Sequence, residues 1–114
     1  MNKIVSKLLF YVALSFGMII ALPASAAADL RAGRIAFDAN SCSSCHEANT
    51  SAIGPSVKDI AKRYKGKPVA AELAQRIRAG SGGRWGEVPH PAYEGMDEAD
   101  ALQIAKWILG GAPR

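Results

Sequence analysis

The chain has 114 residues, which is enough for one domain and too short for two. Its 14 lysine and arginine residues exceed its 10 aspartate and glutamate residues by only four, a balance too mild to indicate binding to nucleic acid. With two cysteines and few aromatic residues, so small a domain has little material for a core. Domains of this kind often need a disulfide, a metal or a large cofactor to stabilise them.

Residues 1–26 have the pattern of a cleaved signal peptide. A start with two lysines precedes an almost continuous apolar run over residues 8–22, and residues 24–26 (Ala-Ser-Ala) match the small-x-small pattern that signal peptidase recognises. The alternative is an uncleaved membrane anchor, although a membrane-spanning helix needs about 20 apolar residues. The sequence therefore predicts export to the periplasm, with residues 27–114 as the mature domain and no membrane attachment after cleavage.

Apolar periodicity and capping residues predict an all-α domain of four or five short helices. We expect Asp29 to cap the first helix, Ser56 the second and Asp97 the last, because a short polar side chain accepts a hydrogen bond from the first helical turn. Gly80 should end the third helix. Residues 41–44 form a loop or one further helical turn. The four main helices are expected at residues 30–40, 57–64, 69–79 and 98–109.

Two segments between the expected helices should be irregular. Residues 47–56 are rich in Asn, Ser, Thr, Gly and Pro, which favour turns and loops. Residues 80–96 contain five glycines and two prolines, and no apolar alternation in them predicts a strand. Because long structureless loops in compact domains usually carry function, the second segment is a candidate for part of the site.

Cys42, Cys45 and His46 form a C-x-x-C-H motif, the attachment signal for c-type haem. Two intervening residues let both sulfur atoms reach the two vinyl groups of one porphyrin, and the next histidine becomes the proximal iron ligand. A haem would also supply the apolar bulk that the core lacks. The alternatives are a thioredoxin-like redox pair, which needs a βαβ context, a zinc site, which needs four ligands, and a plain disulfide.

The sequence resembles the small monohaem class I cytochromes c of bacteria, the cytochrome c-551 type, over nearly all of residues 30–110. This resemblance implies the class I cytochrome c fold, in which short helices wrap around one covalently bound haem c. It also implies that Gly33 and Phe37 pack against the last helix near Trp107. Besides the C-x-x-C-H motif, the stretches that carry the resemblance are residues 53–61, 71–77, 80–86 and 104–109.

The same resemblance implies roles for residues around the haem. The carbonyl of Pro55 should accept a hydrogen bond from the ring N–H of His46, which would fix the ring and raise its basicity. Arg76 and Trp85 match positions that bind a haem propionate in that family.

The sequence departs from the family at the sixth iron ligand. The family has Trp-Gly-x-x-Pro-Met-Pro, whereas residues 85–91 read Trp-Gly-Glu-Val-Pro-His-Pro, so His90 occupies the methionine position. Bis-histidine ligation by His46 and His90 is therefore the leading hypothesis, and it predicts a lowered reduction potential. Met96 is the alternative ligand, although it also suits the apolar position before the Asp97 cap. An open or water-occupied site is the third possibility.

Six-coordinate iron leaves no position for a substrate, so the sequence predicts a periplasmic one-electron carrier and not an enzyme. The alternatives are a haem protein that binds or senses a diatomic gas, and the cytochrome subunit of a periplasmic oxidoreductase complex. Five basic residues crowd into one short segment, either as a solvated helix face or as a docking surface for an acidic redox protein. These residues are Lys58, Lys62, Arg63, Lys65 and Lys67.

Overall fold

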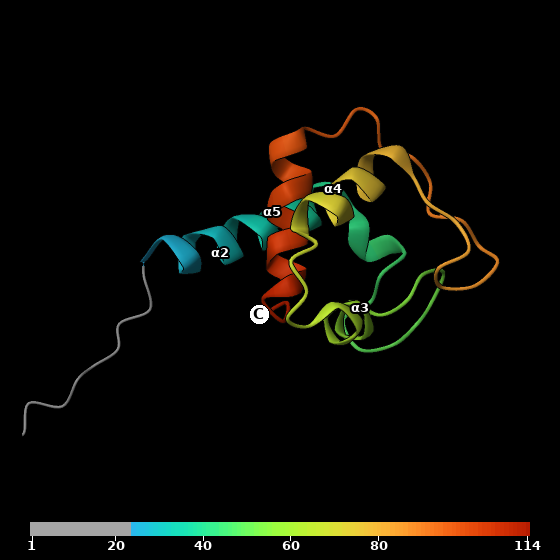
Figure 1. Cartoon of the computed structure of the whole chain (residues 1–114), viewed down its shortest axis with the longest axis horizontal. Helices are drawn as coiled ribbons and strands as arrows, with labels where there is room; N and C mark the ends of the chain where they lie inside the picture. Colours follow the sequence, from blue (N-terminus) through green and yellow to red (C-terminus); the bar gives the residue numbers. More distant parts are fainter. Residues whose placement is uncertain (1–23) are drawn as a thin grey trace, which may run out of the picture.

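The computed structural model describes residues 24–114, so all but the last three residues of the predicted signal peptide lie outside the described part. This part is helical and contains no strand, only two isolated β-bridges, which confirms the all-α prediction. None of its helices is long and apolar enough to cross a membrane. The elements are α2 (Ala24–Ala39), the 3-10 turn η2 (Cys42–Ser44), α3 (Val57–Tyr64), α4 (Ala70–Ala79) and α5 (Glu98–Leu109) (Figure 1).

The first helix begins earlier than predicted. The structure starts α2 at Ala24, because the alanine-rich stretch before Leu30 is a strong helix former. Asp29 therefore lies inside the helix, and the prediction that it caps the helix is wrong. Its carboxylate instead forms an ion pair with the ammonium of Lys106 in α5, at 3.5 Å.

The crossing of α2 and α5 forms the centre of the core, as Figure 1 shows. Gly33 lies against Trp107, and the rings of Phe37 and Trp107 have centroids 5.0 Å apart. This is the packing that the family resemblance implied. The helix α4 also packs on α5, which contributes the fully buried Ile104. Because these helices pack on one another, the loops that connect them can line a pocket beside the helices.

The other predicted helix boundaries agree with the structure to within one residue. Ser56 caps α3 by accepting a hydrogen bond from the backbone N–H of Asp59, and Asp97 caps α5 by accepting one from Ala99. Gly80 ends α4 with a φ of 79°, a backbone conformation that favours glycine. These caps fix where α4 stops and α5 starts, and so define the ends of the glycine-rich loop.

Candidate haem pocket

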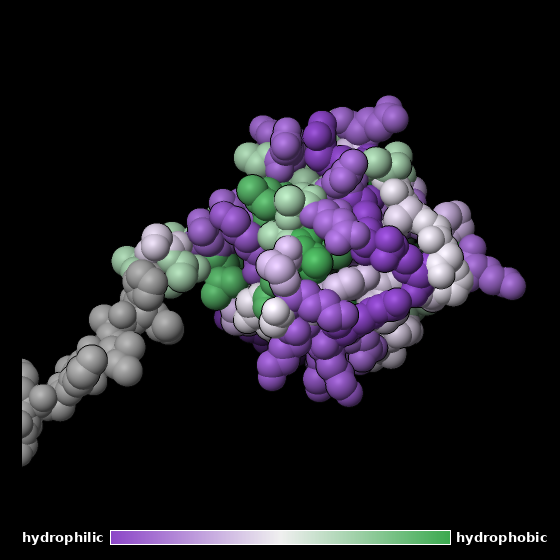
Figure 2. Space-filling model, viewed as in Figure 1, coloured by the Kyte–Doolittle hydropathy of each residue, from purple (hydrophilic) through white to green (hydrophobic). Residues whose placement is uncertain are grey.

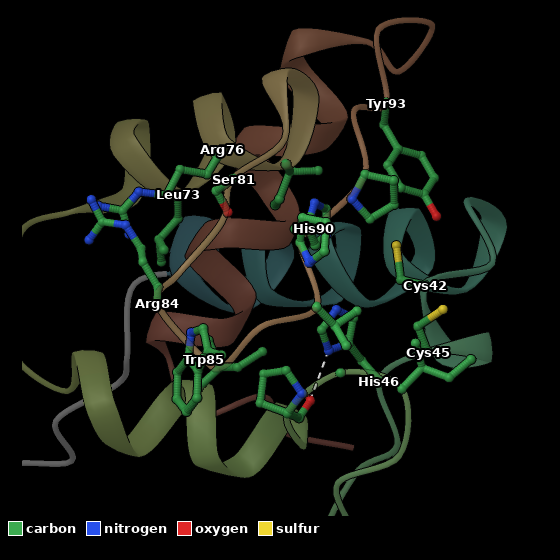
Figure 3. A pocket seen from close by; sticks show the side chains of 18 of the residues that line it. Cys42, Cys45, His46, Leu73, Arg76, Ser81, Arg84, Trp85, His90 and Tyr93 are labelled. Atoms are coloured by element: carbon green, nitrogen blue, oxygen red, sulfur yellow. Dashed lines mark hydrogen bonds between the residues drawn. The ribbon is translucent and has the colours of Figure 1, made fainter.

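A pocket of about 240 Å³ lies between the helices and the glycine-rich loop. Its walls come from all the helical elements and from residues 81–91, and most of the lining side chains are apolar (Figure 3). All of the sequence-predicted site residues except Trp85 are buried or half-buried here, and Trp85 is 41% exposed. The predicted residues that line it are Cys42, Cys45, His46, Pro55, Arg76, Trp85, His90 and Met96.

The two cysteines lie on one side of the pocket because a tight turn holds them. The backbone N–H groups of Cys45 and His46 both donate to the carbonyl of Cys42, at 3.2 and 3.0 Å. No disulfide joins the two cysteines, both are half-buried, and Figure 3 shows their sulfur atoms on the same side of the pocket. Burial raises the pKa of the Cys42 thiol above its ordinary value. Both sulfurs are thus available to one group in the pocket.

The ring of His46 is held by the loop after it. Its Nδ1 lies 2.8 Å from the carbonyl oxygen of Pro55, the hydrogen bond that the family resemblance implied (Figure 3). Since a carbonyl only accepts, Nδ1 carries the proton, and Nε2 of the neutral ring is left as the basic nitrogen. Gly54 allows this close approach, because a Cβ atom there would lie 2.6 Å from Cε1 of His46.

His90 faces His46 in the pocket. The two ring centroids are 6.0 Å apart with an angle of 23° between the ring planes. The Nδ1 atom of His90 is buried and has no hydrogen-bond partner among the described residues. Burial lowers the pKa of His90, and repulsion from the positive charge of a protonated His46 ring would lower it further. The ring is therefore favoured in the neutral form, which is the form that binds metals.

The backbone of His90 is fastened to the end of α4. His90 and Ser81 form an antiparallel bridge, with N–H to carbonyl distances of 2.6 and 3.1 Å. Gly80 makes room for the bridge, because a Cβ atom there would lie 2.9 Å from the carbonyl oxygen of His90. The N–H of Tyr93 donates to the carbonyl of Arg78 at 2.9 Å, which holds the following residues as well. His90 is thus part of a fixed segment.

Met96, the alternative sixth ligand, has a structural role in the core. It is 6% exposed and belongs to the hydrophobic core that the helices form. Its N–H donates to the carbonyl of Tyr93 at 3.0 Å, and its carbonyl accepts from Nε of Arg78 at 3.1 Å. Its side chain also contributes to the pocket wall.

The two residues predicted to bind a propionate both line the pocket, and each has its own protein partners. Arg76 donates to the hydroxyl of Tyr64 at 3.1 Å and forms an ion pair with Glu72. Trp85 lies under the guanidinium of Arg63, whose central carbon is 4.3 Å from the ring centroid. No sequence pattern indicates these contacts of Tyr64 and Arg63, because both join residues far apart in the chain.

The donor set fits a haem better than a bare metal ion. Two thiols and two imidazoles line one apolar pocket, and one buried imidazole nitrogen has no partner among the described residues. Over residues 24–114, no three His, Cys, Asp or Glu side chains come together as a metal ion would require. The zinc alternative therefore lacks ligands in the part of the chain that the structure describes.

The fold and the pocket define a small helical haem protein, and comparison with known proteins identifies its family. The cytochrome c family model matches residues 30–112, so this chain belongs to the cytochrome c family. Cytochrome c-552 of Nitrosomonas europaea is 45% identical over 71 residues, which cover 61% of this chain and 69% of the relative. Cytochrome c-551 of Pseudomonas aeruginosa is 42% identical over 76 residues, which cover 66% and 72%.

A solved structure shows the same fold. The crystal structure of wild-type Nitrosomonas europaea cytochrome c552 matches with a TM-score of 0.64 at 41% identity, over 68% of this chain and 96% of that chain. These findings confirm the class I cytochrome c fold and one covalently bound haem c. The protein is an electron carrier and not an enzyme, as its relatives among the cytochromes c-551, c-552 and c2 are.

Proposed function

We propose that this protein is a periplasmic one-electron carrier of lowered reduction potential. Cys42 and Cys45 bind the haem through thioether bonds, and His46 and His90 bind its iron. The bound haem supplies the one-electron couple between ferrous and ferric iron. The turn at Cys42 holds both sulfurs toward the pocket, and the hydrogen bond to Pro55 orients the ring of His46 and raises its basicity.

The separation of the two histidine rings is the observation that carries this proposal. A metal–imidazole bond is about 2 Å long and the ring centre lies about 1 Å beyond the nitrogen, so two imidazoles on opposite sides of one metal have centroids roughly 6 Å apart. The centroids of His46 and His90 are 6.0 Å apart.

The surroundings of Met96 argue against it as the ligand. Its backbone is bonded on both sides, to Tyr93 and to Arg78, and its side chain belongs to the core. Core packing accounts for its side chain without a bond to iron, whereas the buried Nδ1 of His90 has no partner among the described residues. An imidazole in place of a thioether favours ferric iron, so we expect a reduction potential below that of methionine-ligated cytochromes c.

The predicted signal peptide supports a periplasmic location, and so does the need for export before haem is attached to the cysteines. A gas-binding function would require His90 to leave the iron readily. The bridge between His90 and Ser81 argues against this, because it fixes the backbone that carries the ring. A role as the cytochrome subunit of a larger complex would require copurification with a second protein.

The basic surface formed by Lys58, Lys62, Arg63, Lys65 and Lys67 is the proposed docking site for an acidic redox partner. All five side chains are exposed, and Figure 2 shows hydrophilic residues over α3 on the face in view. Three of the five lie in α3, and Lys65 and Lys67 follow its last residue. Ile60 and Tyr64 of the same helix line the pocket. The basic surface therefore lies on and just after the helix that forms one wall of the haem pocket. Long-range attraction to this surface would bring a partner close to the haem.

Absorption spectra and a redox titration of the secreted protein test the ligand assignment. We expect the ferric wild type and the Met96→Leu variant to lack the far-red charge-transfer band of methionine-ligated haem. We expect His90→Ala to change the spectrum and to bind carbon monoxide when reduced. A far-red band in the wild type that disappears in Met96→Leu would contradict the assignment of His90.

A further inference from the structure

The tip of the glycine-rich loop, residues 82–88, has little to hold it in place. All seven residues are exposed, and three of them are glycines. Gly83 and Gly86 have φ angles of 70° and 121°. Among the described residues, the polar contacts of this tip reach the helices only through Arg63 and Glu72. The contact with Glu72 is the weaker, because its carboxylate is 3.9 Å from Arg84 and is shared with another arginine.

Arg63 contacts the loop tip in two ways at once. Its guanidinium carbon lies 4.3 Å from the centroid of the Trp85 ring, and its Nη1 donates a hydrogen bond to the carbonyl of Arg84 at 2.6 Å. A flat guanidinium can stack on an aromatic face while its in-plane N–H groups donate to a neighbouring acceptor. A lysine ammonium has no such flat face, so this pair of contacts is specific to arginine.

The base of the same loop carries His90. The bridge between Ser81 and His90 closes the loop into a hairpin-like excursion, whose two ends are adjacent and whose tip reaches α3. Only Pro89 separates the tip from His90. Fastening the tip on α3 and the base on α4 therefore restrains the segment that leads into His90 from both sides.

We propose that Arg63 is a positioning residue that fastens the glycine-rich loop to α3 and thereby keeps His90 on the haem iron. This inference deepens the proposed function, because it rests on His90 as the sixth ligand. The proposal also gives Arg63 a role that the other basic residues of α3 do not share. The guanidinium of Arg63 is committed to Trp85 and Arg84, whereas Lys62 forms no ion pair with another described residue.

The test compares Arg63→Gln and Arg63→Lys with Lys62→Gln in the full-length, haem-loaded protein. Lys62→Gln is the matched control, since it removes the same charge from the neighbouring exposed position. Hydrogen exchange of the amides in residues 81–90 reports on the loop, and the rate of carbon monoxide binding to the reduced protein reports on release of His90. Arg63 is exposed, so we expect all three variants to fold.

We expect both Arg63 variants to exchange these amides about five- to tenfold faster than wild type, as loss of a cation–π contact and a hydrogen bond predicts. Carbon monoxide should bind faster by a similar factor, and Lys62→Gln should match wild type in both measurements. Unchanged exchange in Arg63→Gln, or equal effects of Arg63→Gln and Lys62→Gln, would overturn the proposal.

Failure of the proposed function gives a different result. If His90 is not the ligand, Arg63→Gln still speeds hydrogen exchange of the loop, but carbon monoxide binding stays at the wild-type rate. In that case Arg63 fastens the loop but does not act on the iron. The spectra of the Met96→Leu variant identify the ligand independently.

Discussion

Gly33 of α2 lies so close to the backbone carbonyl of Gln103 in α5 that a Cβ atom at position 33 would overlap it. The same hypothetical atom would also overlap Cβ of Trp107. Because backbone atoms cannot rotate out of the way, the crossing of the two helices depends on a residue without a side chain. This crossing also sets where α5 lies along the pocket, so the glycine supports the site as well as the core.

We expect Gly33→Ala to destabilise the protein by about 2–3 kcal/mol, because overpacking a tight contact forces the helices apart. Chemical denaturation of the haem-loaded protein, followed by far-UV circular dichroism, measures the change in the free energy of unfolding. Gly95→Ala is the control, since its Cβ would meet nothing within 4 Å and its backbone is not in the left-handed region. Equal stability of Gly33→Ala and wild type would show that the helices can separate without cost.

Ser56 is fully buried and makes two hydrogen bonds at the start of α3. Its hydroxyl accepts from the N–H of Asp59 at 3.0 Å and donates to the carboxylate of the same residue at 2.7 Å. We expect Ser56→Ala to cost about 1–2 kcal/mol of stability, as loss of an N-cap does. Thr50→Ala, in the exposed loop before α3, should leave stability unchanged when both variants are measured in the same denaturation experiment. A smaller loss for Ser56→Ala than for Thr50→Ala would contradict the capping role.

The caps at Ser56, Gly80 and Asp97 were predictable because capping depends on a few neighbouring residues and on the backbone they leave unpaired. The start of α2 was not, since Asp29 reads as a cap in the sequence while alanine propensity and the pairing with Lys106 continue the helix past it. Cys42, Cys45 and His46 were predictable because the C-x-x-C-H motif identifies them without any knowledge of the fold.

The parts of the pocket that the sequence missed all depend on contacts between distant segments. The hydrogen bonds from Arg76 to Tyr64 and from Arg63 to the glycine-rich loop require α3, α4 and the loop to pack together. A charge pattern places Arg63 among exposed basic residues, and it contains nothing that separates one cation of the group from the others. Only the three-dimensional structure brings the ring of Trp85 beneath it.

Gly80 has a conformation that only glycine adopts readily, with φ of 79° and ψ of 167°. In Gly80→Ala the new Cβ atom would also press on the carbonyl of His90, which is bonded to Ser81. We expect a loss of about 1–3 kcal/mol in the free energy of unfolding and faster carbon monoxide binding to the reduced protein, because the bridge that holds His90 is strained. If Gly80→Ala is destabilised but binds carbon monoxide at the wild-type rate, the bridge does not restrain the ligand.

The basic surface on and just after α3 should make the rate of encounter with a partner depend on salt concentration. We expect Lys58→Gln and Lys65→Gln together to slow electron transfer to an acidic redox protein at low ionic strength, by about threefold or more, and to have no effect at high ionic strength. Stopped-flow mixing over a range of salt concentrations measures this. Replacing two basic residues on other elements, Arg31 and Arg114, is the control for net charge. An association rate that does not depend on ionic strength would argue that these lysines form only a solvated helix face.

Replacing His90 by methionine tests the assignment of the sixth ligand by supplying a different ligand, whereas His90→Ala removes the ligand. Pro89 and Pro91 flank the position on both sides, so the backbone that presents the side chain should be unchanged. We expect His90→Met to raise the reduction potential by on the order of 0.1–0.3 V, within the range of about 0.8 V that axial ligands control. The far-red charge-transfer band should appear in the ferric protein at the same time. Met96→Leu should leave both the potential and the spectrum at wild-type values, because the buried thioether of Met96 packs in the core. If His90→Met leaves the potential unchanged and Met96→Leu lowers it, Met96 binds the iron and the ring of His90 only lines the pocket.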